Sequence, residues 1–227
     1  MLFVAMAKLV NNYRHHTPVV FHSRSRLKIG LVGGSFNPAH EGHIHVALEA
    51  RQKLGLDQIW WLVSPQNPLK STFNMAPLAK RLSDARKAAT PYPFLRVMAP
   101  EAKLQKNYTY NTLKFISKTI PLARLVWIMG ADNLDQFANW HRYHDMIQLL
   151  PIAVIDRPRY SLRAITVGRC LLGRRKTVRK MRHAIAKRSV KLPSWCFITG
   201  QRNPASATEI RQQMYSKTIN STPESKA

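Results

Sequence analysis

Apolar and polar residues alternate along this chain in blocks that predict strands and helices in turn. Short apolar runs rich in β-branched and aromatic residues predict strands at 27–32, 58–64, 94–98, 124–129, 152–155 and 195–199. Apolar positions at helical spacing predict helices at 41–54, 75–89, 109–117 and 208–214. Repeated β-α-β units indicate an α/β fold, a doubly wound, Rossmann-like parallel sheet with helices on both faces.

The length of 227 residues, with 45% apolar residues, is enough for one large domain with a substantial core. We expect a single domain over 27–217, preceded by a flexible leader at 1–26 and followed by a flexible tail at 218–227. The leader has no acidic residue and several basic ones, which faintly resembles a transit peptide. A disordered leader or a misassigned start codon is the simpler interpretation.

Cysteine content and hydropathy narrow the class of protein. The chain has only Cys170 and Cys196 and no C-x-x-C pair, which excludes a disulfide scaffold and a four-thiolate zinc site. A reducing cytoplasm is the compartment that fits. The longest apolar stretches, such as 125–129, fall far below the roughly 18–20 residues of a membrane span, so no membrane partner is expected.

Positive charge is the unusual feature of the composition. The formal net charge is +25, which favours polyanionic partners. Fourteen Lys and Arg residues and no Asp or Glu lie within 157–208. Leu171, Val178, Met181 and Ile185 recur there at helical spacing and predict a basic amphipathic helical segment at 157–191, before the last strand. A solvated helical face is the simpler interpretation; a nucleic-acid surface is the alternative, although no sequence-reading motif accompanies it.

The loop after the first strand carries the most informative residues of the chain. Gly33 and Gly34 end the strand, where they allow a tight turn and close approach of a ligand. In open α/β sheets, ligands bind at the carboxyl ends of strands, and a helix N-terminus there attracts an anion. His40 and His43 stand three residues apart at the start of the next helix, on one face, where both could donate hydrogen bonds to phosphate oxygens.

Other motifs for this loop fail on spacing. The dinucleotide fingerprint, the phosphate loop and the nucleophile elbow are all missing. A zinc protease needs a second histidine four residues after His40, and that position is Ile44. His40, His43 and His45 could still ligate a metal, but His43 and His45 would diverge on a helix, so no resident metal site is assigned.

Residues 33–43 read Gly-Gly-Ser-Phe-Asn-Pro-Ala-His-Glu-Gly-His, which resembles the ATP-binding signature of the nucleotidylyltransferase superfamily. Three later segments, 108–113, 130–133 with Trp140, and 206–211, agree in order and context with its bacterial nicotinate mononucleotide adenylyltransferases. The resemblance covers about residues 28–214. It implies transfer of AMP from ATP to nicotinate mononucleotide, giving deamido-NAD and pyrophosphate in NAD biosynthesis, with Mg²⁺ carried mainly by the ATP phosphates.

The resemblance also implies roles for individual residues. The catalytic residues would be His40, His43 and Arg211. The ATP site would comprise Gly33, Gly34, Ser35, Phe36, His40, His43, Lys70, Gly130, Asp132, Ser206, Thr208 and Arg211. The mononucleotide site would comprise Asn37, Thr109, Asp132 (with the ribose), Trp140 (stacked on the pyridine ring) and the backbone of His141.

Several of these residues also have ordinary structural interpretations. Asp132 and Ser206 could simply cap helices, and Trp140 could be a core residue. Relatives often have a histidine where this chain has Leu69, so Lys70 could be only a surface lysine. Relatives also often have an aromatic residue at the position of His141, so only its backbone role is carried over.

Two rival functions remain open at this level. Phosphopantetheine adenylyltransferases share the first motif, but they are typically shorter and lack the Tyr-Thr and Asp…Trp segments. A protein that binds RNA or a membrane surface through its basic segment is the rival from another class.

Overall fold

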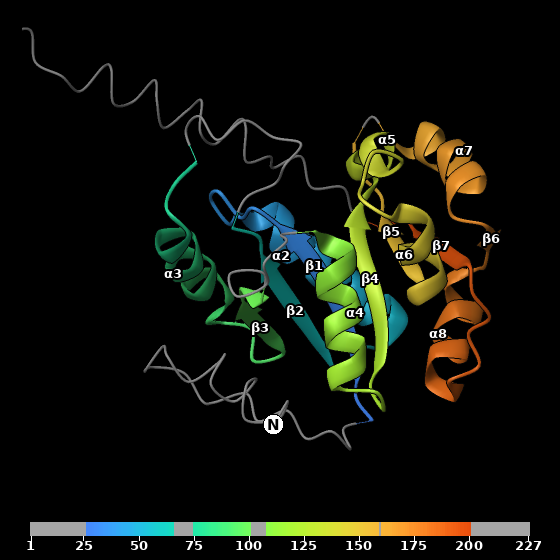
Figure 1. Cartoon of the computed structure of the whole chain (residues 1–227), viewed down its shortest axis with the longest axis horizontal. Coiled ribbons are helices and arrows are strands. Elements are labelled where there is room, and N and C mark those ends of the chain that lie inside the picture. The colour runs from blue at the N-terminus through green and yellow to red at the C-terminus, as the bar shows by residue number, and fades with distance from the viewer. Residues whose placement is uncertain (1–25, 66–74, 101–107, 159, 201–227) are drawn as a thin grey trace, which may run out of the picture.

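One parallel sheet of seven strands forms the centre of the computed structural model, which describes residues 26–65, 75–100, 108–158 and 160–200 (Figure 1). The strands are β1 (Lys28–Gly34), β2 (Gln58–Val63), β3 (Leu95–Met98), β4 (Arg124–Gly130), β5 (Ile152–Ile155), β6 (Arg174–Arg175) and β7 (Ser194–Ile198). Their spatial order is β3-β2-β1-β4-β5-β7-β6. The chain therefore runs outward from β1 in one direction and then, from β4, in the other, which is the doubly wound arrangement predicted.

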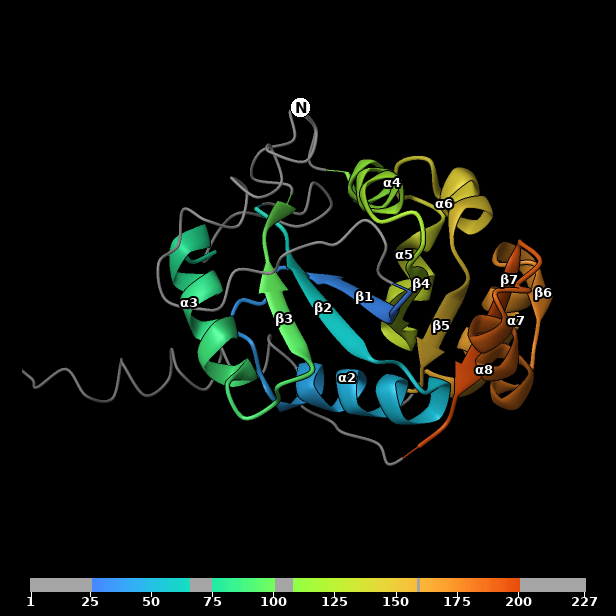
Figure 2. The ribbon, with the colours of Figure 1, turned by 90° about the horizontal axis from the view of Figure 1, so that it is seen from below.

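Helices cover both faces of the sheet (Figure 2). The longer helices are α2 (Glu41–Leu54), α3 (Leu78–Ala89), α4 (Thr109–Thr119), α7 (Ser161–Leu171) and α8 (Val178–Lys187). Three short elements follow β4, namely η2 (Ala131–Asn133), α5 (Leu134–Phe137) and α6 (Tyr143–Leu149). Helices α2, α3 and α8 pack in one core cluster, and α4 to α7 pack in another on the opposite face.

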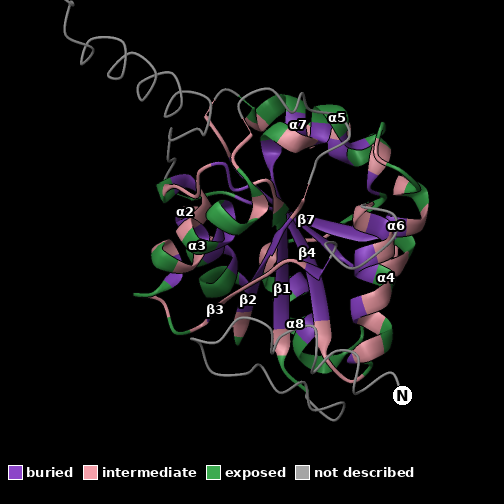
Figure 3. Ribbon diagram, turned by 60° about the vertical axis from the view of Figure 1, so that its left-hand side comes forward, coloured by how far each residue is buried: buried purple, intermediate pink, exposed green. Residues whose placement is uncertain are grey.

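Because both faces of the sheet are covered, its central strands are buried along most of their length (Figure 3). Strand β1 shows the pattern, since Ile29 and Leu31 point into one cluster and Val32 into the other. Trp60 and Trp61 of β2 divide in the same way. This is why the strands appear in the sequence as continuous apolar runs.

The basic helical segment differs in one respect from the prediction. It forms two helices, and Leu171 ends α7 whereas Val178, Met181 and Ile185 belong to α8. Between them Gly173 adopts a positive φ of 76° and the chain extends as β6, which pairs with β7. The four residues therefore do not share one helical face. The predicted helix at 208–214, the leader and the tail lie outside the described residues, apart from residue 26.

Candidate active site

The strand register brings three loops to one edge of the sheet. Gly130 pairs with Ile155, and Val32 pairs with Ile128, so Gly34 and Gly130 end at the same level. The glycine-rich loop after β1, Asp132 after β4 and Arg157 after β5 consequently meet at this edge. It is the carboxyl edge at the point where the strand order reverses, the usual ligand position in this architecture.

His40 and His43 form a reciprocal cap at the start of α2. The backbone N–H of Gly42 donates to Nδ1 of His40 at 3.0 Å, and the backbone N–H of His40 donates to Nδ1 of His43 at 3.3 Å. The two rings lie with their centroids 4.0 Å apart. A nitrogen that accepts a hydrogen bond carries no proton, so each imidazole is neutral and keeps its proton on Nε2, away from the helix backbone.

Burial supports the neutral state of His40. Desolvation, aided by the positive charge of Arg157, lowers the pKa of His40 from 6.5 to about 4, against a smaller opposing effect of Asp132. His40 is therefore an uncharged donor at neutral pH. Two Nε2–H groups at a helix N-terminus form a donor pair for a phosphate without a fixed positive charge.

The ring of Phe36 packs against His43 and so supports the His40–His43 pair from the core. Its side chain is fully buried, with its ring centroid 4.6 Å from that of His43 and 5.0 Å from that of Trp61. Its φ is +47°, a conformation uncommon for a residue other than glycine. A ligand could reach only the backbone of Phe36, because the ring belongs to the core.

Arg81, on α3, holds the surrounding loops together and was not expected from the sequence. It is 2% exposed, and its guanidinium donates to the carbonyl oxygens of Ser35, Ser64 and Pro65 at 2.7 Å each and of Ala76 at 2.8 Å. Asn37, another expected site residue, is also buried, and its Oδ1 accepts from the N–H of Ala76 at 3.2 Å. These bonds tie the loops after β1 and β2 to the start of α3.

Arg157, the first cation of the basic segment, is a second residue at this edge whose position was not expected from the sequence. Its Nε lies 3.7 Å from Oδ1 of Asp132, and its charge acts on His40. The Asp132 carboxylate is 41% exposed and thus accessible from solvent. Both residues follow their strand by two positions, a signal that could have identified Arg157.

The other expected mononucleotide residues, Thr109, Trp140 and His141, lie on the face of the sheet that α4, α5 and α6 cover. Tyr108 precedes α4, and its ring stacks on that of His141 at 4.2 Å, which brings Thr109 and His141 near each other. Trp140 is half-buried, with its ring 6.2 Å from Trp127 and 5.4 Å from Phe137. Trp140 therefore packs on the core with part of its surface and leaves the rest open.

The remaining expected ligands, Lys70, Ser206, Thr208 and Arg211, lie outside the described residues. Within the described ranges, no group of three or more His, Cys, Asp or Glu side chains could hold a metal ion. The same ranges contain no helix that is long and apolar enough to cross a membrane.

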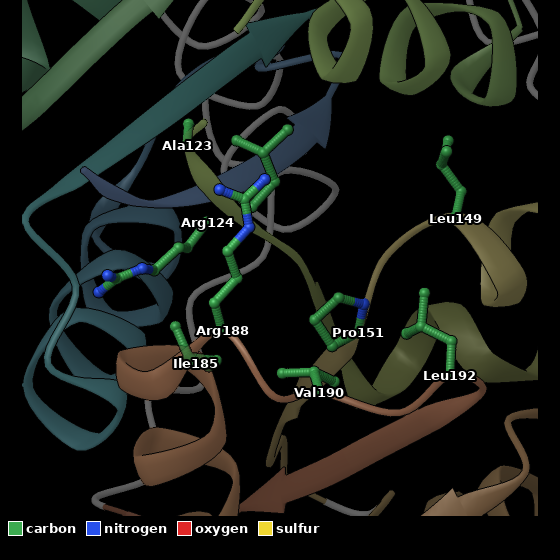
Figure 4. Close-up of a pocket in the computed structure, with 9 residues that line it drawn as sticks. Ala123, Arg124, Leu149, Pro151, Ile185, Arg188, Val190 and Leu192 are labelled. Atoms are coloured by element: carbon green, nitrogen blue, oxygen red, sulfur yellow. The ribbon is translucent and has the colours of Figure 1, made fainter. Parts of the chain in front are cut away.

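A cavity of about 250 Å³ lies at the opposite edge of the sheet (Figure 4). Arg124 at the start of β4, Pro151 just before β5 and Arg188 just after α8 line it, together with apolar side chains. It opens among the amino ends of the strands, so it does not belong to the site described above.

Comparison with known proteins points to one family. The model of the cytidylyltransferase-like family matches residues 31–213. A protein of Parvibaculum lavamentivorans, called a probable nicotinate-nucleotide adenylyltransferase, is 44% identical over 187 residues, covering 82% of this chain and 92% of its own length. A protein of Methylorubrum extorquens with the same description is 41% identical, covering 82% of this chain and 99% of its own.

Solved structures agree on the fold. The Plasmodium falciparum nicotinic acid mononucleotide adenylyltransferase complexed with APC superposes with a TM-score of 0.59 at 15% identity, covering 82% of this chain and 83% of that one. The same enzyme complexed with NaAD gives a TM-score of 0.58 at 16% identity, with the same coverage.

Proposed function

The chain belongs to the cytidylyltransferase-like family, and from this premise we propose that it transfers the adenylyl group of ATP to nicotinate mononucleotide, forming deamido-NAD and pyrophosphate. It is a nucleotidyltransferase, and the name shared by its relatives supplies the acceptor. The observation that carries the proposal is the pair of neutral imidazoles, His40 and His43, at the N-terminus of α2 and at the carboxyl edge of the sheet.

Adenylyl transfer requires that the two substrates are held in position and that the charge on the phosphate oxygens is stabilised. A phosphate oxygen of the mononucleotide attacks the α-phosphorus of ATP, and the bond from that phosphorus to the bridging oxygen breaks, so that pyrophosphate leaves. The attacking phosphate is already ionised at neutral pH, and no general base is needed. The Nε2–H groups of His40 and His43 and the free amides at the start of α2 stabilise the charge on the phosphate oxygens.

Asp132 would bind a ribose hydroxyl, and the neighbouring Arg157 orients its carboxylate across 3.7 Å. Ser206, Thr208, Arg211 and Lys70 are proposed as further ATP contacts on the strength of the resemblance alone. The proposed ATP site also includes the backbone of Gly33, Gly34, Ser35 and Gly130.

The acceptor site would lie at α4. Its first turn has no side-chain cap within the described residues, so the N–H and hydroxyl of Thr109 suit the nicotinate carboxylate. The backbone N–H of His141, held near by the stacking on Tyr108, would be a second donor. The open part of Trp140 would stack on the pyridine ring.

We also propose that Mg²⁺ enters with ATP, held mainly by its phosphates and water, since no group of three or more His, Cys, Asp or Glu side chains within the described ranges could hold the ion. When bound, the ion would neutralise charge on the departing pyrophosphate. The two free cysteines, Cys170 and Cys196, fit a reducing cytoplasm as the compartment.

Pyrophosphate release tests the proposal. The protein is mixed with ATP, Mg²⁺ and one of three acceptors, namely nicotinate mononucleotide, nicotinamide mononucleotide or phosphopantetheine. We expect the highest kcat/KM with the first, since a carboxylate fits the N-terminus of α4 better than a carboxamide does. Release with phosphopantetheine alone, or with none of the three, would contradict the proposal.

Variants of the histidines locate the chemistry. His40→Asn and His43→Asn keep an acceptor near the position of Nδ1, and hence the cap, but remove the distal N–H. Each should lower kcat by about 10²–10³, the usual effect of losing one charge-stabilising donor. His45→Asn, on the same helix two residues further on, is the matched control and should stay within about twofold of the parent, far below that effect.

A further inference from the structure

The end of the molecule opposite β3, formed by α7, β6 and α8, carries a surface for which adenylyl transfer has no use (Figures 1 and 2). Six side chains there are exposed and make no hydrogen bond or ion pair with any described residue. They are Arg169, Arg174, Arg179, Lys180, Lys187 and Lys191, and we call them the basic band.

The amphipathic pattern of α8 determines the position of half of this band. Met181, Ala184 and Ile185 are buried against the core, so Arg179, Lys180 and Lys187 must face solvent. From 179 to 187 the helix advances about 12 Å, enough to pass several phosphates of a nucleic-acid strand. No acidic residue occurs between 157 and 200 to neutralise these charges.

Protection of a sheet edge does not account for the band. Strand β6 is the edge strand, and cations on an edge discourage pairing with another chain. However, β6 is only two residues long, and of the six cations only Arg174 lies on it. The others lie on α7, on α8 and in the loop before β7.

The surroundings of the band decide between classes of polyanion. A peripheral membrane site needs apolar side chains that enter the lipid, and a protein interface needs an apolar centre. The exposed large hydrophobic residues of the described chain are Leu27, Leu48, Tyr160 and Leu162. Tyr160 and Leu162 lie at the first turn of α7, and none of the four lies on β6, on α8 or in the loop before β7, where five of the six cations are. Interfaces with nucleic acid are instead polar and strongly positive.

We propose that the basic band binds the phosphate backbone of nucleic acid without reading its sequence. The cations neutralise phosphates and release condensed counterions, which is a binding mode that needs neither aromatic stacking nor base contacts. The band lies on α7, β6, α8 and the loop before β7, away from His40 and His43 at the start of α2, so binding there is independent of adenylyl transfer.

Fluorescence anisotropy with a labelled 20-base-pair DNA duplex and a labelled RNA of the same length tests the proposal on the full chain. We expect a Kd of about 1–100 µM at 150 mM KCl and a steep decrease in affinity with salt. The triple variant Arg179→Gln/Lys180→Gln/Lys187→Gln should bind at least about tenfold more weakly, with the slope of log K against log salt reduced by two to three.

The matched control removes the same charge elsewhere, as Lys53→Gln/Lys87→Gln/Lys118→Gln, all three exposed. It should retain nearly full affinity, and both variants should keep the far-ultraviolet circular dichroism spectrum of the parent, which reports a native fold. Equal loss of affinity in the two variants, or no binding at 50 mM KCl, would overturn the proposal. So would binding to phosphatidylserine vesicles in preference to both nucleic acids. None of these results bears on the proposed reaction.

Discussion

The carboxyl edge around β1, β4 and β5 and the basic band around β6 and α8 both suit anions, but they do so in opposite ways. At the first, the donors are neutral imidazoles and amides held by caps, by Phe36 and by Arg81. At the second, the charges are full, exposed and unrestrained by described partners. Catalysis requires donors fixed where charge develops, whereas attraction at a distance requires only net charge.

The comparison explains why the net charge of +25 was a poor guide to the chemistry. Few cations lie at the reaction site, and one of them, Arg81, donates its hydrogen bonds to backbone carbonyl oxygens. Most of the cations of the basic segment lie on α7, β6 and α8 or in the loops beside them, away from the edge where the loops after β1, β4 and β5 meet.

The largest effect is expected at Arg81. Arg81→Met would leave carbonyls of three loop segments without their buried donor, and should lower the free energy of unfolding by about 3–5 kcal/mol. Arg81→Lys should lie between, because an ammonium cannot reach all four oxygens in the fork geometry of a guanidinium. Urea unfolding measures both. Lys87→Met, exposed on the same helix, is the control, and a loss as large there would mean that the guanidinium contacts are unimportant.

Two adjacent glycines give a sharper test of the same edge. A Cβ on Gly33 would lie 2.5 Å from Cη2 of Trp127, which is buried, so Gly33→Ala should cost about 1–3 kcal/mol of stability. A Cβ on Gly34 would meet the Phe36 ring at 3.3–3.7 Å, so Gly34→Ala should cost less than about 1 kcal/mol. Thermal unfolding of both variants decides; equal losses would show that the packing of Trp127 does not select glycine.

The state of His40 predicts how stability depends on pH. Its pKa is lowered from 6.5 to about 4. Between these pH values His40 is protonated in the unfolded chain and neutral in the folded chain. The stabilisation from a neutral His40 is therefore present above pH 6.5 and is lost as the pH falls toward 4. Compared with His40→Asn, the parent should lose about 1–2 kcal/mol more between pH 7 and pH 4.5, a value reduced for solvent screening of the partly exposed ring. An equal loss of stability in the parent and in His40→Asn between pH 7 and pH 4.5, measured by urea denaturation, would contradict a buried, neutral imidazole.

The sequence predicted the central strands and their assembly into a parallel, doubly wound sheet, because apolar runs are local signals. It also predicted that the glycine-rich loop and the start of the next helix lie at the carboxyl end of the first strand, which is where the structure has them, whereas the binding roles of their residues stay a prediction. Helix α2 is found at 41–54 as predicted. Arg81 could not be found in this way, since its partner Ser35 is 46 residues away and a buried arginine resembles any other on a helix. Arg157 was not distinguished from the other Lys and Arg residues of the basic segment. Strand β6 was missed because two residues carry no periodicity.

The smallest effect is expected at the basic band, and it separates the two regions most directly. The side chains of Arg179, Lys180 and Lys187 make no hydrogen bond or ion pair with a described residue, so their replacement by glutamine should change the free energy of unfolding by less than about 0.5 kcal/mol. Relief of repulsion should give this change a stabilising sign at 20 mM salt that disappears at 500 mM. Urea midpoints at both salt concentrations measure it. A destabilisation that persists at high salt would mean that these cations, like Arg81, hold the fold together, and the contrast between a fixed site and a free charged surface would then fail.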